Sequence, residues 1–304
     1  MRICSLLPSA TEIVCQLGLG DQLVAVTHEC DFPPQILGLP KITGNTIDQS
    51  GASSREIHHH ITEALHQGSS IYELDQALLE ALHPDLVLTQ ELCDVCAVSY
   101  KSVQKAVRLL DGQTKILSLE PTHLNEILQT IHQVGQLTGA GIKAGQVVND
   151  LQQRITAIAE SAAAAASPPR VLGLEWLDPP FVGGHWVPEM IKMAGGVDGL
   201  GTAGAPSFET SWSRITEYDP QIIILMPCGF DLEQTLRETD RADLSEHWNS
   251  LQAVRSGQVY AVDGSAYFNR PGPRIVDGLQ ILAEIIQPRL FARKSPPSAW
   301  QVLA

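Results

Sequence analysis

The chain has 304 residues, of which 44% are hydrophobic, and its mean hydropathy is +0.01. These values are typical of a globular protein with a substantial core, and no segment approaches the roughly 20 apolar residues that would span a bilayer. The net charge of −14 and the lack of a basic run argue against a nucleic-acid-binding protein, because such binding depends on clustered Lys and Arg residues.

The first half of the chain alternates short apolar runs with helical patterns. Strands are predicted over residues 3–7, 23–26, 86–88 and 115–119, and helices over 11–17, over 101–110 and in a segment that ends at Leu82. Apolar strands that alternate with helices predict a parallel sheet covered on both faces.

The second half repeats this order. Its predicted strands are 170–174, 222–225 and 258–262, and its predicted helices are 187–194 and a segment that ends at Tyr218. The best match between the halves is a unit of helix end, proline and apolar strand, at Leu82–Leu88 and Tyr218–Leu225. This weak duplication predicts two similar α/β lobes.

Between the halves, residues 122–166 carry apolar side chains at helical spacing, with no proline before Pro168. We therefore expect an N-terminal lobe over 1–121, one long interlobe backbone helix over 122–167 and a C-terminal lobe over 168–304. The tail after Pro288 has no counterpart in the first half, and we expect it to be peripheral.

The first strand begins almost at Met1, without the basic patch, apolar stretch and small-residue cleavage site of an export signal. The six cysteines are far too few for a disulfide scaffold, and Cys4 and Cys15 lie in apolar patterns. Both observations favour a cytoplasmic protein with reduced thiols.

Several motifs, in this order along the chain, resemble those of the solute-binding proteins of ABC transporters. They are Ser5–Glu12, His28–Pro34, Pro84–Val87, Asp178–Gly184, Ala194–Gly196 and Arg270–Ile275. Two Rossmann-like lobes joined by a backbone helix are the architecture of the class III members, which bind vitamin B12, haem and siderophores. Within that family the chain is most similar to the cobalamin-binding branch, so the resemblance implies cobalamin or a related corrinoid as ligand.

Ligands of open α/β sheets bind beyond the carboxyl ends of the strands, and polar and aromatic residues follow several strands here. The residues expected to contact the ligand in a cleft between the lobes are Ser9, Glu29, Gln90, Glu175, Trp176, His185, Trp186, Trp212, Tyr267, Asn269 and Arg270. Flat rings suit a flat macrocycle, although some of the tryptophans could instead be ordinary packing residues. Catalysis has no support, since no nucleophile with a partnered base and no phosphate loop is present.

The resemblance also implies docking on an ABC importer through an exposed acid on each lobe. Here Ala77 and Ser213 fall at those positions, which puts importer docking in doubt.

Cys93 and Cys96 form a C-x-x-C pair after the strand at 86–88. With His28 and Cys30 they could bind zinc or iron, which gives an alternative function as a metal-binding protein or metal-dependent enzyme. A packing role and a redox dithiol are the other interpretations of the pair.

His185 could coordinate the metal of a tetrapyrrole, bond a propionate or amide, or cap the helix that follows it. His58, His59 and His60 are predicted to lie on the solvated face of a polar helix. The leading hypothesis is therefore an intracellular, non-catalytic binder of a tetrapyrrole-like ligand, beside the metal alternative and an interaction module that binds neither.

Overall fold

The computed structural model describes residues 1–46, 51–66, 71–90, 100–109, 114–242 and 244–303. The chain divides into two compact units. The first consists of Met1–Gly51, His59–Pro121 and Glu126–Asn149, and the second of Ala52–His58, Thr122–Asn125 and Asp150–Ala304. Both α2 (Ser54–His66) and α6 (Gly141–Ala162) therefore contribute residues to both units.

In the described part of the chain, the first unit holds a four-stranded parallel sheet in the order β2-β1-β5-β6. Its strands are β1 (Ile3–Ser5), β2 (Leu23–Val26), β5 (Leu86–Thr89) and β6 (Lys115–Ser118), and its helices include α1 (Pro8–Gln16), α3 (Gln76–Leu82) and α4 (Tyr100–Leu109). A separate antiparallel pair is formed by β3 (Thr43–Asn45) and β4 (Tyr72–Leu74). One cluster of buried side chains joins Cys4 and Val87 of the sheet to Leu79 of α3 and Val103 of α4.

The second unit has a sheet in the order β12-β11-β10-β7-β8-β9 over the described residues. Its strands are β7 (Val171–Leu177), β8 (Pro180–Val182), β9 (Phe208–Glu209), β10 (Ile222–Leu225), β11 (Val259–Val262) and β12 (Trp300–Val302). The strands β7, β10 and β11 run parallel, as predicted. All four residues of β10 are buried, because helices cover both faces of this sheet.

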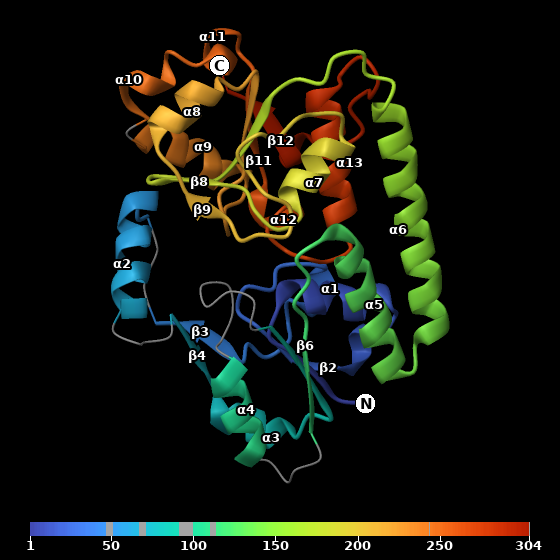
Figure 1. Ribbon diagram of the computed structural model, residues 1–304. Coiled ribbons are helices and arrows are strands. Elements are labelled where there is room, and N and C mark those ends of the chain that lie inside the picture. The colour runs from blue at the N-terminus through green and yellow to red at the C-terminus, as the bar shows by residue number, and fades with distance from the viewer. Residues whose placement is uncertain (47–50, 67–70, 91–99, 110–113, 243, 304) are drawn as a thin grey trace. The chain divides into compact units, whose positions relative to one another are not determined.

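The helices of the second unit lie on the two sides of this sheet (Figure 1). On one side are α7 (Val187–Met193) and α13 (Ile275–Ile286), and on the other are α8 (Trp212–Tyr218), α9 (Leu232–Arg241), α10 (Ser245–Trp248) and α11 (Gln252–Arg255). The short helix α12 (Gly264–Tyr267) follows β11. Gly173 in β7 lets α7 approach closely, because a Cβ there would touch Val187 and Ile191.

The helix-proline-strand unit predicted for each half is present in both. Asp75 caps α3 and Ser211 caps α8, each by accepting a hydrogen bond from the backbone N–H three residues later. Both helices end on a non-glycine residue in the left-handed region, His83 with φ 41° and Asp219 with φ 45°. The duplication therefore extends to the backbone conformation of the helix ends.

The predicted single backbone helix is wrong, because the stretch forms two helices. The first, α5 (Leu124–Thr138), ends at Gly139, whose φ of +78° lies in the left-handed region, and α6 begins at Gly141. A Cβ on Gly135 of α5 would overlap the Cβ of Ala144 in α6, so the two helices pack closely beside this turn.

The tail after Pro288 was expected to be peripheral, but it completes the second sheet. Residues Trp300–Val302 form the edge strand β12, antiparallel to β11. The carboxylate of Glu284, which is 3% exposed, holds the tail by accepting hydrogen bonds from Lys294 N at 2.9 Å and Ser295 Oγ at 2.5 Å. Among the described residues, no helix has the length and apolar character needed to cross a membrane.

Candidate functional site

In the second unit, the carboxyl ends of β7 and β10 lie side by side. Met226 N donates to Leu174 O at 2.8 Å, and Cys228 N donates to Glu175 O at 3.0 Å, so the pairing with β7 continues past the end of β10. This is the edge at which open α/β sheets bind their ligands. Most of the residues predicted for the second lobe gather here.

Glu175 fixes the loop that connects β8 to α7. Its Oε1 accepts a hydrogen bond from Gly184 N at 3.1 Å. A Cβ on Gly184 would overlap the backbone of Pro206 and Ser207, so only glycine fits this close approach. One carboxylate oxygen of Glu175 therefore has a hydrogen-bond partner in this loop.

His185 follows this glycine in a strained conformation. Its φ is +48°, its side chain is half-buried, and its backbone N donates to Ala205 O at 2.6 Å. Burial lowers the pKa of the imidazole, which favours the neutral ring. Its ring lies 5.6 Å from that of Trp186, and its nitrogens make no hydrogen bond to a described side chain or backbone group. A neutral imidazole of this kind can act as a metal ligand.

Trp176 lies beside this loop, at the end of β7. Its indole N–H donates to Ser54 O at 3.1 Å, and its ring centroid lies 5.3 Å from that of Phe230. The residue as a whole is partly exposed. The ligand contact predicted for Trp176 stays a prediction.

Two of the aromatic residues predicted as ligand contacts make packing contacts within the second unit, and their ligand contact stays a prediction. Trp186 is only 6% exposed, and its indole N–H donates to Phe268 O at 2.8 Å. Trp212 packs its ring edge-on against Trp248 of α10, at a centroid distance of 5.9 Å, beside the core cluster of the second sheet. Residue type and position in a loop do not reveal this burial.

Asn269 and Arg270 lie near the end of β10. Asn269 Nδ2 donates weakly to Met226 O at 3.4 Å, whereas its buried Oδ1 has no hydrogen-bond partner within the described ranges. Arg270 is half-buried and lies close enough to Asp263 to favour the ionised carboxylate. Burial is the stronger influence there, and it raises the pKa of Asp263.

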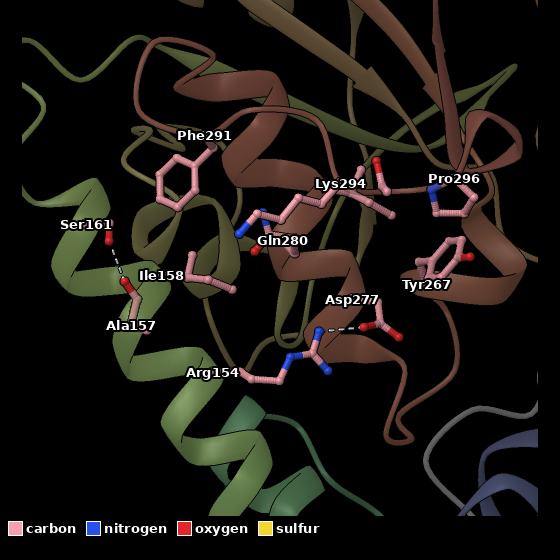
Figure 2. A pocket seen from close by; sticks show the side chains of 12 residues that line it. Arg154, Ala157, Ile158, Ser161, Tyr267, Asp277, Gln280, Phe291, Lys294 and Pro296 are labelled. Atoms are coloured by element: carbon pink, nitrogen blue, oxygen red, sulfur yellow. Dashed lines mark hydrogen bonds and ion pairs between the residues drawn. The ribbon is translucent and has the colours of Figure 1, made fainter.

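Tyr267 lines a different hollow of the second unit. This groove of about 530 Å³ lies between residues 154–161 of α6, the start of α13 and tail residues 291–296 (Figure 2). An ion pair between Arg154 Nη2 and Asp277 Oδ1, 2.5 Å apart, stands at one end of it. Of the predicted ligand contacts, Tyr267 is the one that lines this groove.

In the first unit, His28 is held by a polar cluster. Its Nδ1 lies 2.7 Å from Thr43 Oγ1, and its Nε2 lies 2.9 Å from Asn45 Oδ1 and 3.1 Å from Glu29 Oε1. Burial alone would lower the pKa of the ring, but the hydrogen bond and charge of Glu29, with the bond to Asn45, raise it above its usual value. Both nitrogens therefore have protein partners.

Three further predicted residues of the first unit are deeply buried. Ser9 is 4% exposed, Cys30 3% and Gln90 7%. The Cys30 Sγ lies 3.1 Å from Thr11 Oγ1, which in turn donates to Ser5 Oγ. Glu29 is the predicted residue of this unit whose side chain is well exposed, at 39%.

The predicted metal site gains no support. Within the described ranges, no group of three or more His, Cys, Asp or Glu residues could hold a metal ion. His28 and Cys30 are engaged by the contacts above, and the other two predicted ligands, Cys93 and Cys96, lie outside the described residues. The site stays a prediction.

Ala77 and Ser213, which occupy the expected docking positions, are exposed in the first turns of α3 and α8. The neighbouring Asp75 accepts the hydrogen bond of Leu78 N and serves as the cap of α3.

One functional candidate was not predicted from the sequence. Residues 52–58 belong to the second unit, although most of the flanking chain belongs to the first. Ser54 contacts Trp176, Arg55 pairs with Asp178 at 2.8 Å, and His58 lies 5.7 Å from Phe181 between ring centroids. His58 is thus not on a wholly solvated face, whereas His59 and His60 are exposed as predicted.

Comparison with known proteins identifies the family. A family model described as "Periplasmic binding protein" matches residues 3–266. The chain belongs to the periplasmic binding protein family. Members of this family bind solutes and work with ABC transporters, and the similar proteins are not enzymes. The resemblance seen in the sequence is thereby confirmed.

Individual relatives agree with this membership. A vitamin B12-binding protein of Vibrio cholerae is 26% identical over 283 residues, which cover 92% of this chain and 86% of the relative. The crystal structure of periplasmic vitamin B12 binding protein BtuF of Vibrio cholerae has a TM-score of 0.69 at 23% identity, covering 94% of this chain and 96% of that one. Periplasmic heme-binding protein RhuT from Roseiflexus sp. RS-1 has a TM-score of 0.71 at 22% identity, covering 95% and 98%. These likenesses confirm the two-lobe α/β fold.

Proposed function

We propose that this chain is a non-catalytic binding protein for a tetrapyrrole-like ligand, and specifically for a cobalamin or related corrinoid. Similar proteins include vitamin B12-binding and heme-binding proteins, which supports the ligand class. The finer choice of a corrinoid rests on the similarity to the vitamin B12-binding relative.

The observation that carries the proposal is the state of His185. Its backbone is strained at φ +48°, its ring makes no hydrogen bond to any described group, and burial lowers the pKa of the imidazole, which favours the neutral form. It lies in the loop after β8, beside the sheet edge at which open α/β sheets bind ligands. Strained residues of this kind gather at functional sites, and a neutral imidazole binds cobalt or iron. In this proposal His185 coordinates the metal, Trp176 packs on the macrocycle, and Asn269 and Arg270 bond its peripheral groups.

An absorption titration tests the proposal. Purified protein is titrated with cyanocobalamin, hydroxocobalamin, hemin and a ferric hydroxamate siderophore, and saturable binding at micromolar concentration is expected for a corrinoid. Replacement of His185 by Ala should shift the visible band of the bound hydroxocobalamin, because the axial ligand changes. Failure of all four compounds to bind would refute the proposal.

The place where the protein works is a further part of the proposal. We infer that it acts in the cytoplasm without docking on an importer, in keeping with Ala77 and Ser213 at the docking positions. Cell fractionation with antibody detection tests the first point. Stable binding to an ABC importer in detergent would contradict the second.

A further inference from the structure

We infer that residues 52–58, at the start of α2, are positioning residues for ligand binding: they hold the Trp176 indole in its orientation at the edge of the second sheet. This inference rests on the proposed function, because it concerns the same surface. The segment Ala52–His58 is named the clamp below.

The clamp contains the N-terminus of α2, which is capped. Ser53 Oγ accepts a hydrogen bond from Glu56 N at 3.3 Å, and Glu56 Oε2 accepts one from Ser53 N at 2.8 Å. This reciprocal pair is a capping box, which fixes the first turn of a helix. These two hydrogen bonds therefore define the shape of the first turn.

A buried carboxylate anchors this turn to α9. Ser54 N donates to Glu238 Oε1 at 2.8 Å, and the two residues are 0% and 3% exposed. The first N–H groups of a helix lack partners within the helix, and a carboxylate there is stabilised by both the hydrogen bond and the helix dipole. Hydrogen bonds to a charged group are among the stronger ones, so this contact is the main anchor.

The backbone carbonyl of Ser54, in the same turn, holds Trp176. Ser54 donates from its N–H to Glu238, and its carbonyl accepts the indole N–H of Trp176 at 3.1 Å. One residue therefore links the anchor on α9 to the ring at the end of β7. The indole is thus contacted at its nitrogen by Ser54 and at its ring by Phe230, whose centroid lies 5.3 Å away.

Two peripheral contacts fix the clamp on the β7–β8 turn. Arg55 Nε lies 2.8 Å from Asp178 Oδ2, and His58 lies against Phe181. Arg55 is 68% exposed, so its ion pair adds little strength. The ion pair does define the position of the first turn of α2 relative to the β7–β8 connection. Ile57, at 4% exposure, buries the inner face of the same turn.

The decisive experiment removes the anchor and measures ligand affinity. Glu238→Ala should weaken binding of the corrinoid that the wild type binds by about fivefold to tenfold, because Trp176 is then less well ordered. Glu238→Gln keeps an acceptor and should stay within about twofold. The matched control is Glu233→Ala, which removes an 80% exposed carboxylate from the same helix and should change nothing.

A double-mutant cycle separates positioning from general stability. In a Trp176→Ala background, Glu238→Ala should cause no further loss of affinity, because the ring that it positions is gone. An equal loss in both backgrounds would show that Glu238 acts on the fold as a whole, and would overturn the inference.

Ligand-free measurements keep this test distinct from that of the proposed function. Hydrogen exchange of the amides in 52–58 should be faster in Glu238→Ala than in the wild type. Faster exchange with unchanged affinity would overturn the inference, whereas absence of any ligand binding by the wild type would refute the proposed function itself. Should Glu238→Ala not fold, Arg55→Glu provides the second variant, since it places like charges together on the surface and should weaken binding about twofold.

Discussion

Arg2 and Arg170 make the same contact in their respective units. Each precedes the first strand of its half, and each guanidinium Nε donates to a carbonyl at the end of the helix before the proline: Leu82 O at 2.8 Å and Tyr218 O at 3.1 Å. The carbonyls at a helix end lack partners within the helix, so both arginines satisfy groups that the fold leaves open. The duplication suggested by Pro84 and Pro220 thus includes a side-chain contact.

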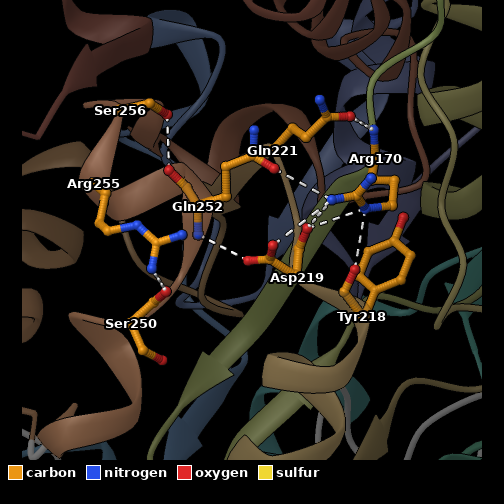
Figure 3. A network of polar contacts seen from close by, with 8 residues as sticks. All are labelled: Arg170, Tyr218, Asp219, Gln221, Ser250, Gln252, Arg255 and Ser256. Carbon is orange, nitrogen blue, oxygen red and sulfur yellow. Dashed lines mark hydrogen bonds and ion pairs between the residues drawn. The ribbon is translucent and has the colours of Figure 1, made fainter.

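Arg170 makes the larger of the two networks (Figure 3). Its guanidinium also donates to Asp219 O and to Gln252 Oε1, so it ties α8 to α11. Arg170→Met should lower the free energy of unfolding by about 1–2 kcal/mol, because the carbonyls lose their donors. Urea denaturation followed by circular dichroism measures this change. Arg255→Met, which removes an exposed hydrogen bond to Ser250 O, is the control and should stay within about 0.5 kcal/mol.

The raised pKa of His28 makes its contribution to stability depend on pH. The charged ring is favoured in the folded state, so its stabilising effect is full below the usual histidine pKa and is lost as pH rises through the raised value. His28→Gln should therefore destabilise the protein more at pH 5.5 than at pH 8.5, by less than about 1 kcal/mol because Glu29 is partly exposed. Urea midpoints at the two pH values test this, and an equal loss at both would contradict it.

The thiols of the described cysteines should differ strongly in reactivity. Burial, together with the nearby Cys30, raises the pKa of Cys4 to about 12, and burial with the charge of Glu12 raises that of Cys15 to about 11. Cys228 is exposed. Brief iodoacetamide treatment at pH 8 should therefore modify Cys228 and leave Cys4 and Cys30 intact until the protein is unfolded. Peptide mass spectrometry reads the sites, and early modification of Cys4 would contradict the packing described.

Gly184 should not tolerate a side chain. A Cβ there would overlap backbone atoms of Ala205, Pro206 and Ser207, which cannot move aside as a flexible side chain could. Gly184→Ala should cost about 1–3 kcal/mol of unfolding free energy and displace His185. Gly145→Ala in α6 is the control, because nothing lies within 4 Å of its Cβ position. Alanine there should be neutral or stabilising by up to about 1 kcal/mol, and equal losses in both variants would contradict the close approach at Gly184.

The sequence was most informative where local pattern and burial agree. The strand predicted at Ile222–Leu225 has the same first and last residues as β10, because four apolar residues follow a helix end and a proline. The helix break was missed, since apolar spacing continues across Gly139 and only its left-handed φ separates α5 from α6. β12 was missed because its pairing with β11 joins segments about 40 residues apart and its three residues carry no pattern of their own.

Prediction of the site from the sequence has the same limit. His185 and Trp176 could be selected as residues that follow strands, but burial separates Trp186 from Trp176, and burial is a property of the folded chain. The contacts of residues 52–58 were beyond sequence reasoning altogether. Ser54 and Glu238 are 184 positions apart, and neither belongs to a motif that points to the other.

The strand β12 has a consequence for how the molecule behaves in concentrated solution. It occupies the outer edge of the second sheet, next to β11, whose four residues are buried. An uncovered edge of this kind offers unpaired N–H and C=O groups to any passing strand, and it is a common route to aggregation. Residues 300–302 therefore cover the edge of β11, and the sheet ends instead in a strand of three residues, the short kind of edge that limits pairing with other chains.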